Sequence, residues 1–330
     1  MSEEIRERTP RDAAVEGHSQ PGGSGGPPPP ADSELDATYR EGLRIEARSQ
    51  WQLFRRRFVT HKLAMVSLFI LLIICGAALF ADRVAPYGFE QIDLGNRSKA
   101  PTLEDNHFFG TDKIGRDYFS RVLYGTGTSV RVAFFVAFLS TAIGTVVGAL
   151  AGYYRGWLDN VLMRFVDFLL AVPFLAVLLV AAAFLGRGSP YRVATIIALL
   201  LWTTIARIVR GQYLSLREKE FVEAARASGA SDARIIFRHM LPNTFSPIIV
   251  NATLTVALAI LLEATLSFLG FGIQPPTPAL GKLIDDGKGA MLTDWWLVTM
   301  PGLMIVTICL CINFIGDGLR DALDPTQSER

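Results

Sequence analysis

The 330-residue chain has few charged residues and very few cysteines, and each scarcity excludes a class of protein. Only 19% of the residues are charged, whereas about a quarter is usual for soluble domains. The three cysteines, Cys75, Cys309 and Cys311, lie in apolar runs, which excludes a disulfide scaffold and predicts packing roles. A formal net charge of +1 leaves no basic excess for binding nucleic acid. With 50% hydrophobic residues, the composition indicates an integral membrane protein.

Sequence patterns for catalysis are also missing. No Gly-x-x-x-x-Gly-Lys-[Ser/Thr] string occurs, so the chain has no P-loop with which to hydrolyse ATP. The four histidines form no His-Glu-x-x-His pair, and no Gly-x-Ser-x-Gly elbow is present. We therefore predict a non-catalytic protein without metal ligands and without a cofactor of its own.

The first hundred residues divide into two parts. Residues 1–49 contain a Gly-, Pro- and Ser-rich stretch that cannot bury enough apolar surface to fold, which predicts a disordered cytoplasmic tail. In residues 50–100, Trp51, Phe54 and Phe58 recur at helical spacing beside a basic run, which is typical of a helix at an anionic membrane surface. An ordinary cytosolic stop before the first span explains the same residues. The first span and the start of an external loop complete this part.

Apolar runs predict an all-α protein embedded in the cell membrane. Five runs are long enough to cross a bilayer, and a sixth is weaker. The five are 63–81, 130–153, 168–186, 248–269 and 295–315, and the weaker one is 193–209. If the weaker run also crosses, the basic stretches at 55–62 and 207–243 share one side, as the positive-inside rule requires. We therefore predict six spans, with both termini and the loop 207–247 in the cytoplasm.

The predicted spans contain several groups with structural or functional potential. Gly144, Gly148 and Gly152 repeat every fourth residue, which predicts close helix contact. Arg164 and Asp167 are spaced for a local ion pair. Glu263 is an acidic side chain well inside a span, where an ionised carboxylate costs about 2.5–3.5 kcal/mol unless it is partnered or hydrated. It either lines a translocation path together with Ser267 or anchors the helix bundle, and the sequence leaves both open.

A polar segment at 82–129 is predicted to form a folded external element, whose second part covers 101–129. It contains the string Phe109-Gly-Thr-Asp-Lys-Ile-Gly-Arg-Asp117. The spacing of Asp112 and Asp117 does not match an EF-type calcium loop, so we predict a hydrogen-bonded turn rather than a metal site.

The loop 207–247 contains the most informative stretch, EAARASGASDARIIFRHMLP at 223–242. A short helix is predicted to end at Gly229, which suits the left-handed conformation of a helix C-cap. A second helix should begin after Ser231 and end at Pro242. Two short helices with a face of small residues would form a compact docking surface.

This stretch resembles the loop of integral membrane subunits of ATP-binding-cassette (ABC) importers. The matching residues are Glu223, Ala224, Ala225, Gly229, Leu241 and Pro242, while His239 stands where the family often has Ile. The resemblance implies that this loop docks into an ATPase subunit. A random amphipathic loop is the alternative that a Glu-Ala-Ala string alone would leave open.

Three further strings resemble the C-type permease subunit of dipeptide, oligopeptide and nickel importers. They are the 109–117 string, with Gly110, Thr111, Asp112, Gly115, Arg116 and Asp117, the string 262–270 followed by Gln274-Pro-Pro-Thr-Pro278, and 313–325. The resemblance covers residues 50–325 and implies a type I ABC importer permease domain at 130–325, followed by a short tail at 326–330.

The resemblance also implies partners. These are a second homologous permease, two ABC ATPase subunits that bind ATP and Mg²⁺, an extracytoplasmic substrate-binding protein and the surrounding membrane lipid. Peptide is the leading cargo, with nickel or another small solute as alternatives. A hypothesis of a different class is a secondary carrier or channel driven by an ion gradient.

Overall fold

The computed structural model describes residues 50–185 and 189–323. Chain contacts separate residues 1–48 from residues 49–330, and the account below concerns the second unit. The predicted disordered tail and the C-terminal tail at 326–330 lie outside the described residues, as do Asp324 and Pro325.

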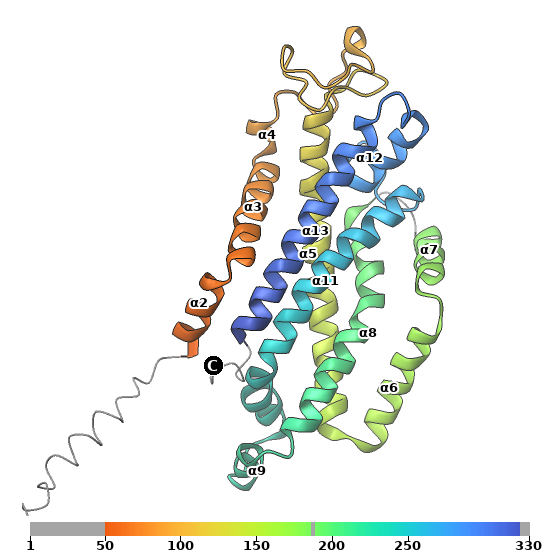
Figure 1. Ribbon diagram of the computed structural model, residues 1–330. Coiled ribbons are helices and arrows are strands. Elements are labelled where there is room, and N and C mark those ends of the chain that lie inside the picture. Colours follow the sequence, from red (N-terminus) through yellow and green to blue (C-terminus); the bar gives the residue numbers. More distant parts are fainter. Residues whose placement is uncertain (1–49, 186–188, 324–330) are drawn as a thin grey trace, which may run out of the picture. The chain divides into compact units, whose positions relative to one another are not determined.

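The described residues are helical and contain no β-strand, only an isolated bridge between Thr111 and Asp117. The helices before the central bundle are α2 (Gln50–Thr60), α3 (Lys62–Leu79) and α4 (Ala81–Val84). Those that follow are α5 (Tyr118–Tyr154), α6 (Gly156–Ala171), α7 (Phe174–Leu185), α8 (Pro190–Leu216), α9 (Glu220–Ala227), α10 (Asp232–Arg234), α11 (Phe245–Phe268), α12 (Leu280–Gly287) and α13 (Trp296–Leu323). Figure 1 shows the long helices running side by side. The predicted all-α class is confirmed.

By length and composition, five described helical segments can cross a membrane, and a bent pair, α6 with α7, brings the number to six. The sequence prediction was wrong about which of two apolar runs forms the stronger span. The run 168–186 is broken, because Val172 is extended before Pro173 and the two helices meet at 89°. The weaker run 193–209 lies in the continuous helix α8 instead.

Helix α5 begins earlier than predicted. Its N-cap is Asp117, whose side chain accepts a hydrogen bond from the Ser120 backbone N–H at 2.7 Å, so the first twelve residues of the helix were assigned to the external loop. Their polar side chains lowered the hydropathy, but Ser120, Arg121 and Thr126 are buried inside the protein and do not face lipid. The segment that was predicted to be external therefore ends at residue 117.

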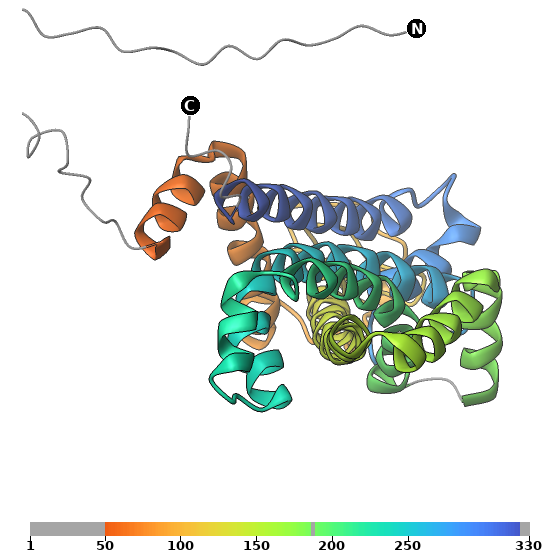
Figure 2. The ribbon, with the colours of Figure 1, turned by 90° about the horizontal axis from the view of Figure 1, so that it is seen from below.

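The predicted glycine seam is confirmed as the contact between α5 and α8. A Cβ added at Gly148 would lie 2.4 Å from the Ala206 carbonyl oxygen, and one at Gly144 would lie 2.6 Å from the Trp202 carbonyl oxygen. Only glycine allows two backbones to approach so closely. Figure 2, in which α5 is seen nearly end-on, shows it lying among the other helices.

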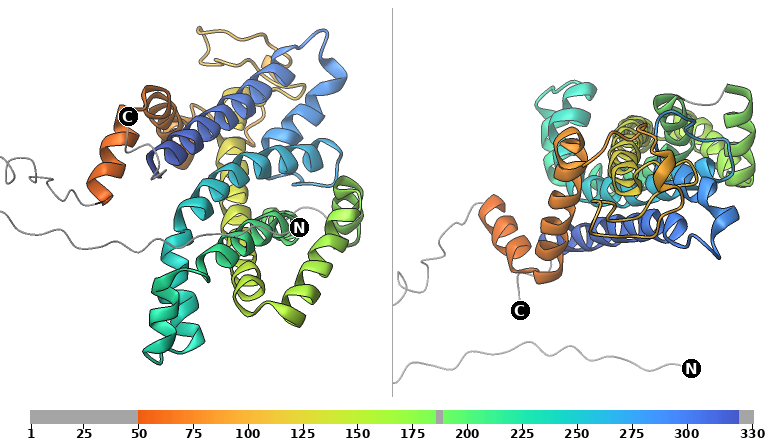
Figure 3. Two further views of the ribbon diagram at one scale, coloured as in Figure 1. Left: turned by 60° about the horizontal axis from the view of Figure 1, so that its bottom comes forward. Right: turned by 90° about the horizontal axis from the view of Figure 1, so that it is seen from above.

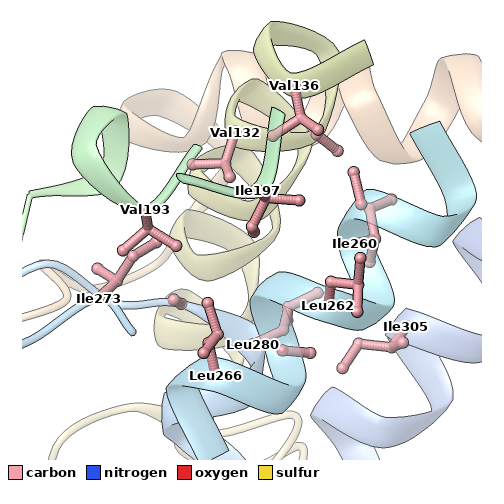
Figure 4. Close-up of a cluster of buried hydrophobic side chains, with 14 of the residues drawn as sticks. Val132, Val136, Val193, Ile197, Ile260, Leu262, Leu266, Ile273, Leu280 and Ile305 are labelled. Carbon is pink, nitrogen blue, oxygen red and sulfur yellow. The ribbon is translucent and has the colours of Figure 1, made fainter. Parts of the chain in front are cut away.

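The main apolar core joins α5, α8, α11, α12 and α13 near the end of the bundle where α5 begins. Figure 4 labels ten of its members, including Val132 of α5, Ile197 of α8, Ile260 of α11 and Ile305 of α13. Helix α3 packs mainly on α13 and leaves Phe69 and Leu72 exposed, as expected for a helix that faces lipid.

Two predictions about the helix ends have different outcomes. The helix expected around Phe54 and Phe58 exists as α2, and nothing in the structure tests its contact with a membrane surface. In the sequence, Asp317, Arg320, Asp321 and Asp324 follow the last apolar run and predict a short amphipathic helix just past it. This prediction is wrong, because α13 continues unbroken to Leu323. There His61, at the junction of α2 and α3, lies 3.6 Å from Asp321.

Candidate functional site

The loop between α8 and α11 turns sharply at Gly229, which has φ +79° and so confirms the predicted left-handed C-cap. The Ala230 N–H donates to the Ala225 carbonyl at 3.1 Å, and the Gly229 N–H donates to the Arg226 carbonyl at 3.0 Å. These two bonds form a Schellman motif, which satisfies the last carbonyls of α9. The turn is therefore fixed by its own backbone.

The motif residues of α9 face in two directions. Ala225 and Val222 are buried in a small apolar cluster with Ile235 and Ile236 from the following helix. Glu223, Ala224 and Gly229 are exposed on the outer surface. Glu220, Phe221 and Arg226 of the same helix are exposed as well, so this outer surface combines charged side chains with small residues at which another protein could approach the backbone closely.

The helix expected to end at Pro242 does not end there. Residues Asp232–Phe268 are helical throughout, with a π-helix at Ile235–Met240 and a 3-10 helix at Leu241–Thr244. In an α-helix the ring of Pro242 would clash with the carbonyl four residues earlier. In the π-turn the Leu241 N–H donates instead to the Ile236 carbonyl, five residues earlier, which widens the helix just before the proline. The change of helix type thus accommodates Pro242.

The remaining motif residues lie along this transition. Leu241 packs against the apolar cluster and Pro242 is exposed. His239 is half-buried, and its carbonyl accepts a hydrogen bond of 2.6 Å from the Asn243 amide. At the start of the helix, Ser231 has the backbone of an N-cap, but its side chain makes no capping bond.

Two tyrosines that the sequence analysis missed fasten this loop to the bundle. Tyr153, at the end of α5, donates a hydrogen bond of 2.6 Å to the Asp232 carboxylate. Tyr213 of α8 donates one of 3.0 Å to the Ile236 carbonyl. The Arg217 guanidinium in turn donates to the Tyr153 carbonyl at 2.8 Å. A tyrosine near the end of an apolar run could have indicated such a contact, because a buried tyrosine hydroxyl needs a hydrogen-bond partner.

Glu263 is fully buried, and both carboxylate oxygens are hydrogen-bonded. Ser129 of α5 donates to one and Ser267 of α11 to the other, each at 2.7 Å. Ser129 also accepts from the Leu280 N–H at 3.3 Å, which adds α12 to the network. Of the two interpretations, this geometry supports the bundle anchor, because the carboxylate faces other helices of the same chain.

The 109–117 string forms a compact turn around Asp112. Its Oδ1 accepts from the backbone N–H groups of Ile114 and Arg116, at 3.0 and 2.9 Å. Its Oδ2 accepts from the side chains of Arg116 and Arg121, at 2.7 and 2.8 Å. Gly110 and Gly115 supply positive φ angles of 74° and 85°. The carboxylate is saturated by donors, as expected for a turn framework.

The rest of the motif ties this turn to distant helices. Asp117 accepts from Ser120 and pairs with His107 at 2.8 Å. Thr111 accepts, through its carbonyl, a hydrogen bond of 3.1 Å from the Trp296 indole of α13. Figure 3 shows this external segment close to the start of α13. Within residues 50–185 and 189–323, no group of three or more His, Cys, Asp or Glu side chains could hold a metal ion.

Charged side chains on α6 pair across the bundle rather than locally. Asp167 contacts Arg207 of α8 at 2.5 Å, so the expected pair with Arg164 is wrong. Asp159 forms a bidentate pair with Arg210, at 2.6 and 2.7 Å. Spacing along one helix cannot reveal a partner on another.

Comparison with known proteins agrees with this architecture. Residues 144–329 match the family model described as binding-protein-dependent transport system inner membrane component. Residues 49–101 match the N-terminal TM domain of oligopeptide transport permease C.

Curated relatives match most of the chain. The oligopeptide transport system permease protein OppC of Escherichia coli is 42% identical over 89% of this chain and 97% of its own length. The glutathione transport system permease protein GsiD of Shigella dysenteriae is 41% identical over 85% of this chain and 92% of its own.

A solved structure, an inward-facing MetNI methionine ABC transporter, matches 62% of this chain and 98% of the matched chain. Its TM-score is 0.52 at 20% identity, which supports the predicted type I importer permease fold and nothing beyond the fold. The family model covers more than half of the chain, and the relatives above match nearly all of the helical bundle. The chain therefore belongs to the family of inner membrane components of binding-protein-dependent transport systems, as an ABC importer permease.

Proposed function

We propose that this chain is the C-type permease subunit of an ATP-driven importer of di- and oligopeptides. Two relatives that match over most of its length are named as oligopeptide and glutathione permeases, and glutathione is itself a short peptide. The chain forms the translocation path together with a second, homologous permease. An extracytoplasmic binding protein delivers the peptide, and ATP and Mg²⁺ are bound by two ATPase subunits.

The observation that supports coupling is the outer surface of α9, with Glu223 and Ala224 exposed while Ala225 and Val222 are buried beneath them. Such a surface fits a groove on an ATPase subunit, with Glu223 facing a cation. In this arrangement the loop and both termini lie in the cytoplasm. Closure of the ATPase subunits on ATP moves the loop, and Tyr153 and Tyr213 pass that movement to α5 and α8.

Glu223→Lys tests the coupling surface, because a reversed charge at an interface opposes the docking of a complementary partner. We expect the ATPase subunits to be lost on affinity purification and ATP-dependent uptake of a labelled tripeptide to fall by about tenfold or more. Glu104→Lys makes the same charge change on an exposed residue of the external segment and should alter neither quantity. Normal co-purification and uptake in Glu223→Lys would show that the loop does not couple.

Reconstitution tests the class of transporter. Proteoliposomes that hold both permeases and the ATPases, with the binding protein present, should accumulate the labelled tripeptide only when ATP is supplied. Uptake that survives removal of the ATPases and follows an ion gradient would identify a secondary carrier or channel. Uptake of Ni²⁺ in place of the tripeptide would replace the peptide cargo with a metal.

A further inference from the structure

A cavity of about 320 Å³ lies at the end of the bundle where α5 begins. Its walls come from three parts of the chain, namely the turn around Asp112, the first turn of α5 with Arg121, and α12 with the start of α13. These parts meet near the upper end of the molecule in Figure 1. The volume is at the lower end of the range of small-molecule pockets, about 300–1,000 Å³.

The Arg121 guanidinium lines this cavity and has unused hydrogen-bond donors. Its side chain is only 5% exposed. One terminal nitrogen donates to Asp112 at 2.8 Å, the other lies 3.9 Å from Asp286, and the buried Nε has no hydrogen-bond partner within the described structure. A guanidinium carries five N–H donors, and a buried donor without a partner is rare in folded proteins. Nε itself is closed off, but the terminal nitrogen that faces Asp286 makes no hydrogen bond within the described structure, so an acceptor entering the cavity would satisfy that nitrogen.

The carboxylates of the cavity are already committed to other cations. Both oxygens of Asp112 are occupied by backbone and arginine donors. Asp286 lies 2.8 Å from Lys282, closer than it lies to Arg121. The lining contains three cations, Lys113, Arg116 and Arg121, and two carboxylates, which leaves a net positive charge, and Lys282 outside the lining adds to it.

The remaining walls are apolar. Ile114, Leu283 and Leu297 line the cavity together with the ring of Tyr118. The Tyr118 hydroxyl is used elsewhere, since it donates toward the carbonyls of Leu297 and Leu283. These apolar walls favour an organic monoanion over a strongly hydrated dianion such as phosphate, because the dianion costs more to remove from water.

We propose that this cavity binds an organic carboxylate, with Arg121 as the residue that pairs with it. The carboxylate comes from one of two sources, a small carboxylate in solution such as a peptide C-terminus, or an acidic side chain of a protein docked on this face. Binding itself does not depend on the proposed function. Only a role in receiving peptide rests on it.

The test uses the full-length chain, purified with its co-purifying subunits in lipid nanodiscs and titrated by calorimetry. N-acetylalanine is the probe, its methylamide is the control without a carboxylate, and inorganic phosphate is the competing dianion. We expect N-acetylalanine to bind and the other two not to bind. Arg121→Gln should weaken binding by about tenfold or more, as for the loss of a hydrogen bond to a charged group.

Asp286→Asn is a second test of the carboxylate site, which can be used if Arg121→Gln does not fold. Removing this carboxylate frees Arg121 from its long-range partner and should tighten N-acetylalanine binding several-fold. Lys288→Gln removes a nearby cation that does not line the cavity and should leave binding unchanged. Equal binding of the methylamide, or weaker binding in Asp286→Asn, would overturn the proposal.

Docking of the purified extracytoplasmic protein to the nanodiscs separates the two sources. If N-acetylalanine does not bind, but docking is weakened by Arg121→Gln and strengthened by Asp286→Asn, the carboxylate is a side chain of that protein. If neither N-acetylalanine binding nor docking responds to these variants, the cavity has no carboxylate ligand and the proposal is wrong. Glu223→Lys tests the proposed coupling and does not touch the carboxylate site. Binding of N-acetylalanine can therefore fail while the proposed function holds, and the proposed function can fail while this binding holds.

Discussion

Ser129 on α5 donates a hydrogen bond of 2.7 Å to the Glu263 carboxylate on α11, in a position where neither side chain is exposed. The two residues are 134 positions apart in the sequence, so the bond joins two helices that are distant along the chain. Because a buried polar group without a partner is costly, each residue makes the other acceptable inside the bundle. The pair therefore specifies how α5 and α11 pack.

Substitution of Glu263 should separate charge from hydrogen bonding. Glu263→Gln keeps an acceptor for one serine and should retain folding and transport. Glu263→Leu strands the hydroxyls of Ser129 and Ser267 and should lower the free energy of unfolding by about 1–3 kcal/mol, with loss of transport. Thermal unfolding in nanodiscs and peptide uptake are the measurements. Thr265→Ala, which removes a hydroxyl bonded only to its own helix, is the control. Loss of transport in folded Glu263→Gln would favour a role in the translocation path.

The glycine seam predicts a strong effect of a single methyl group. A Cβ at Gly148 would lie 2.4 Å from the Ala206 carbonyl, so Gly148→Ala should push α5 and α8 apart and destabilise the protein by about 1–3 kcal/mol. Gly211, which lies on α8, has open space where a Cβ would be added. Gly211→Ala should therefore be neutral, or stabilising by up to about 1 kcal/mol. Equal thermal midpoints for the two variants would contradict the seam.

The Tyr153 hydroxyl should matter for coupling more than for docking. Tyr153→Phe removes the hydrogen bond to Asp232 and leaves the ring in place, so α9 should keep its surface while the loop is held less firmly to α5. We expect the ATPases to co-purify normally and the peptide imported per ATP hydrolysed to fall several-fold. The ratio of uptake to phosphate release measures this. Tyr191→Phe, on an exposed tyrosine of α8, is the control. An unchanged ratio would remove Tyr153 from the coupling route.

Acid should loosen α12 through Asp285. Burial alone would raise the pKa of this carboxyl, but hydrogen bonds from Lys282 and Lys288 outweigh it and hold the pKa below its ordinary value of 3.8. A lowered pKa contributes stability above 3.8 that is lost as pH falls through the folded-state value. The protection factors of the α12 amides in hydrogen exchange, taken relative to the intrinsic rate at each pH, should therefore fall below about pH 4. Asp285→Asn should remove this pH dependence, and an unchanged dependence would assign it to other carboxyls.

Local features were predictable from the sequence because they depend on neighbouring residues. The left-handed Gly229, the glycine seam and the turn around Asp112 each follow from residue types at fixed spacing, and the structure shows all three. The docking loop was located by the same kind of pattern, although its contact with an ATPase stays a prediction.

Tertiary contacts were not predictable in the same way. Arg207 and Arg210 lower the hydropathy of α8, yet they pair with Asp167 and Asp159 of α6, so α8 is the continuous helix. Pro242 was expected to end a helix, but a π-turn absorbs it. Each error arose where a group's partner lies on another helix or where helix geometry changes locally.

The unbroken helix from Asp232 to Phe268 has a mechanical consequence. Its hydrogen bond to α5 at Glu263 lies near one end, at about 45–50 Å from Asp232 and roughly 8 Å from Phe268 for a rise of about 1.5 Å per residue. The same helix is bonded to α5 at its other end as well, where Tyr153 donates to Asp232. Two attachments this far apart oppose rotation of the helix about a single contact point. A displacement imposed at the loop is therefore carried by α5 and this helix as a pair.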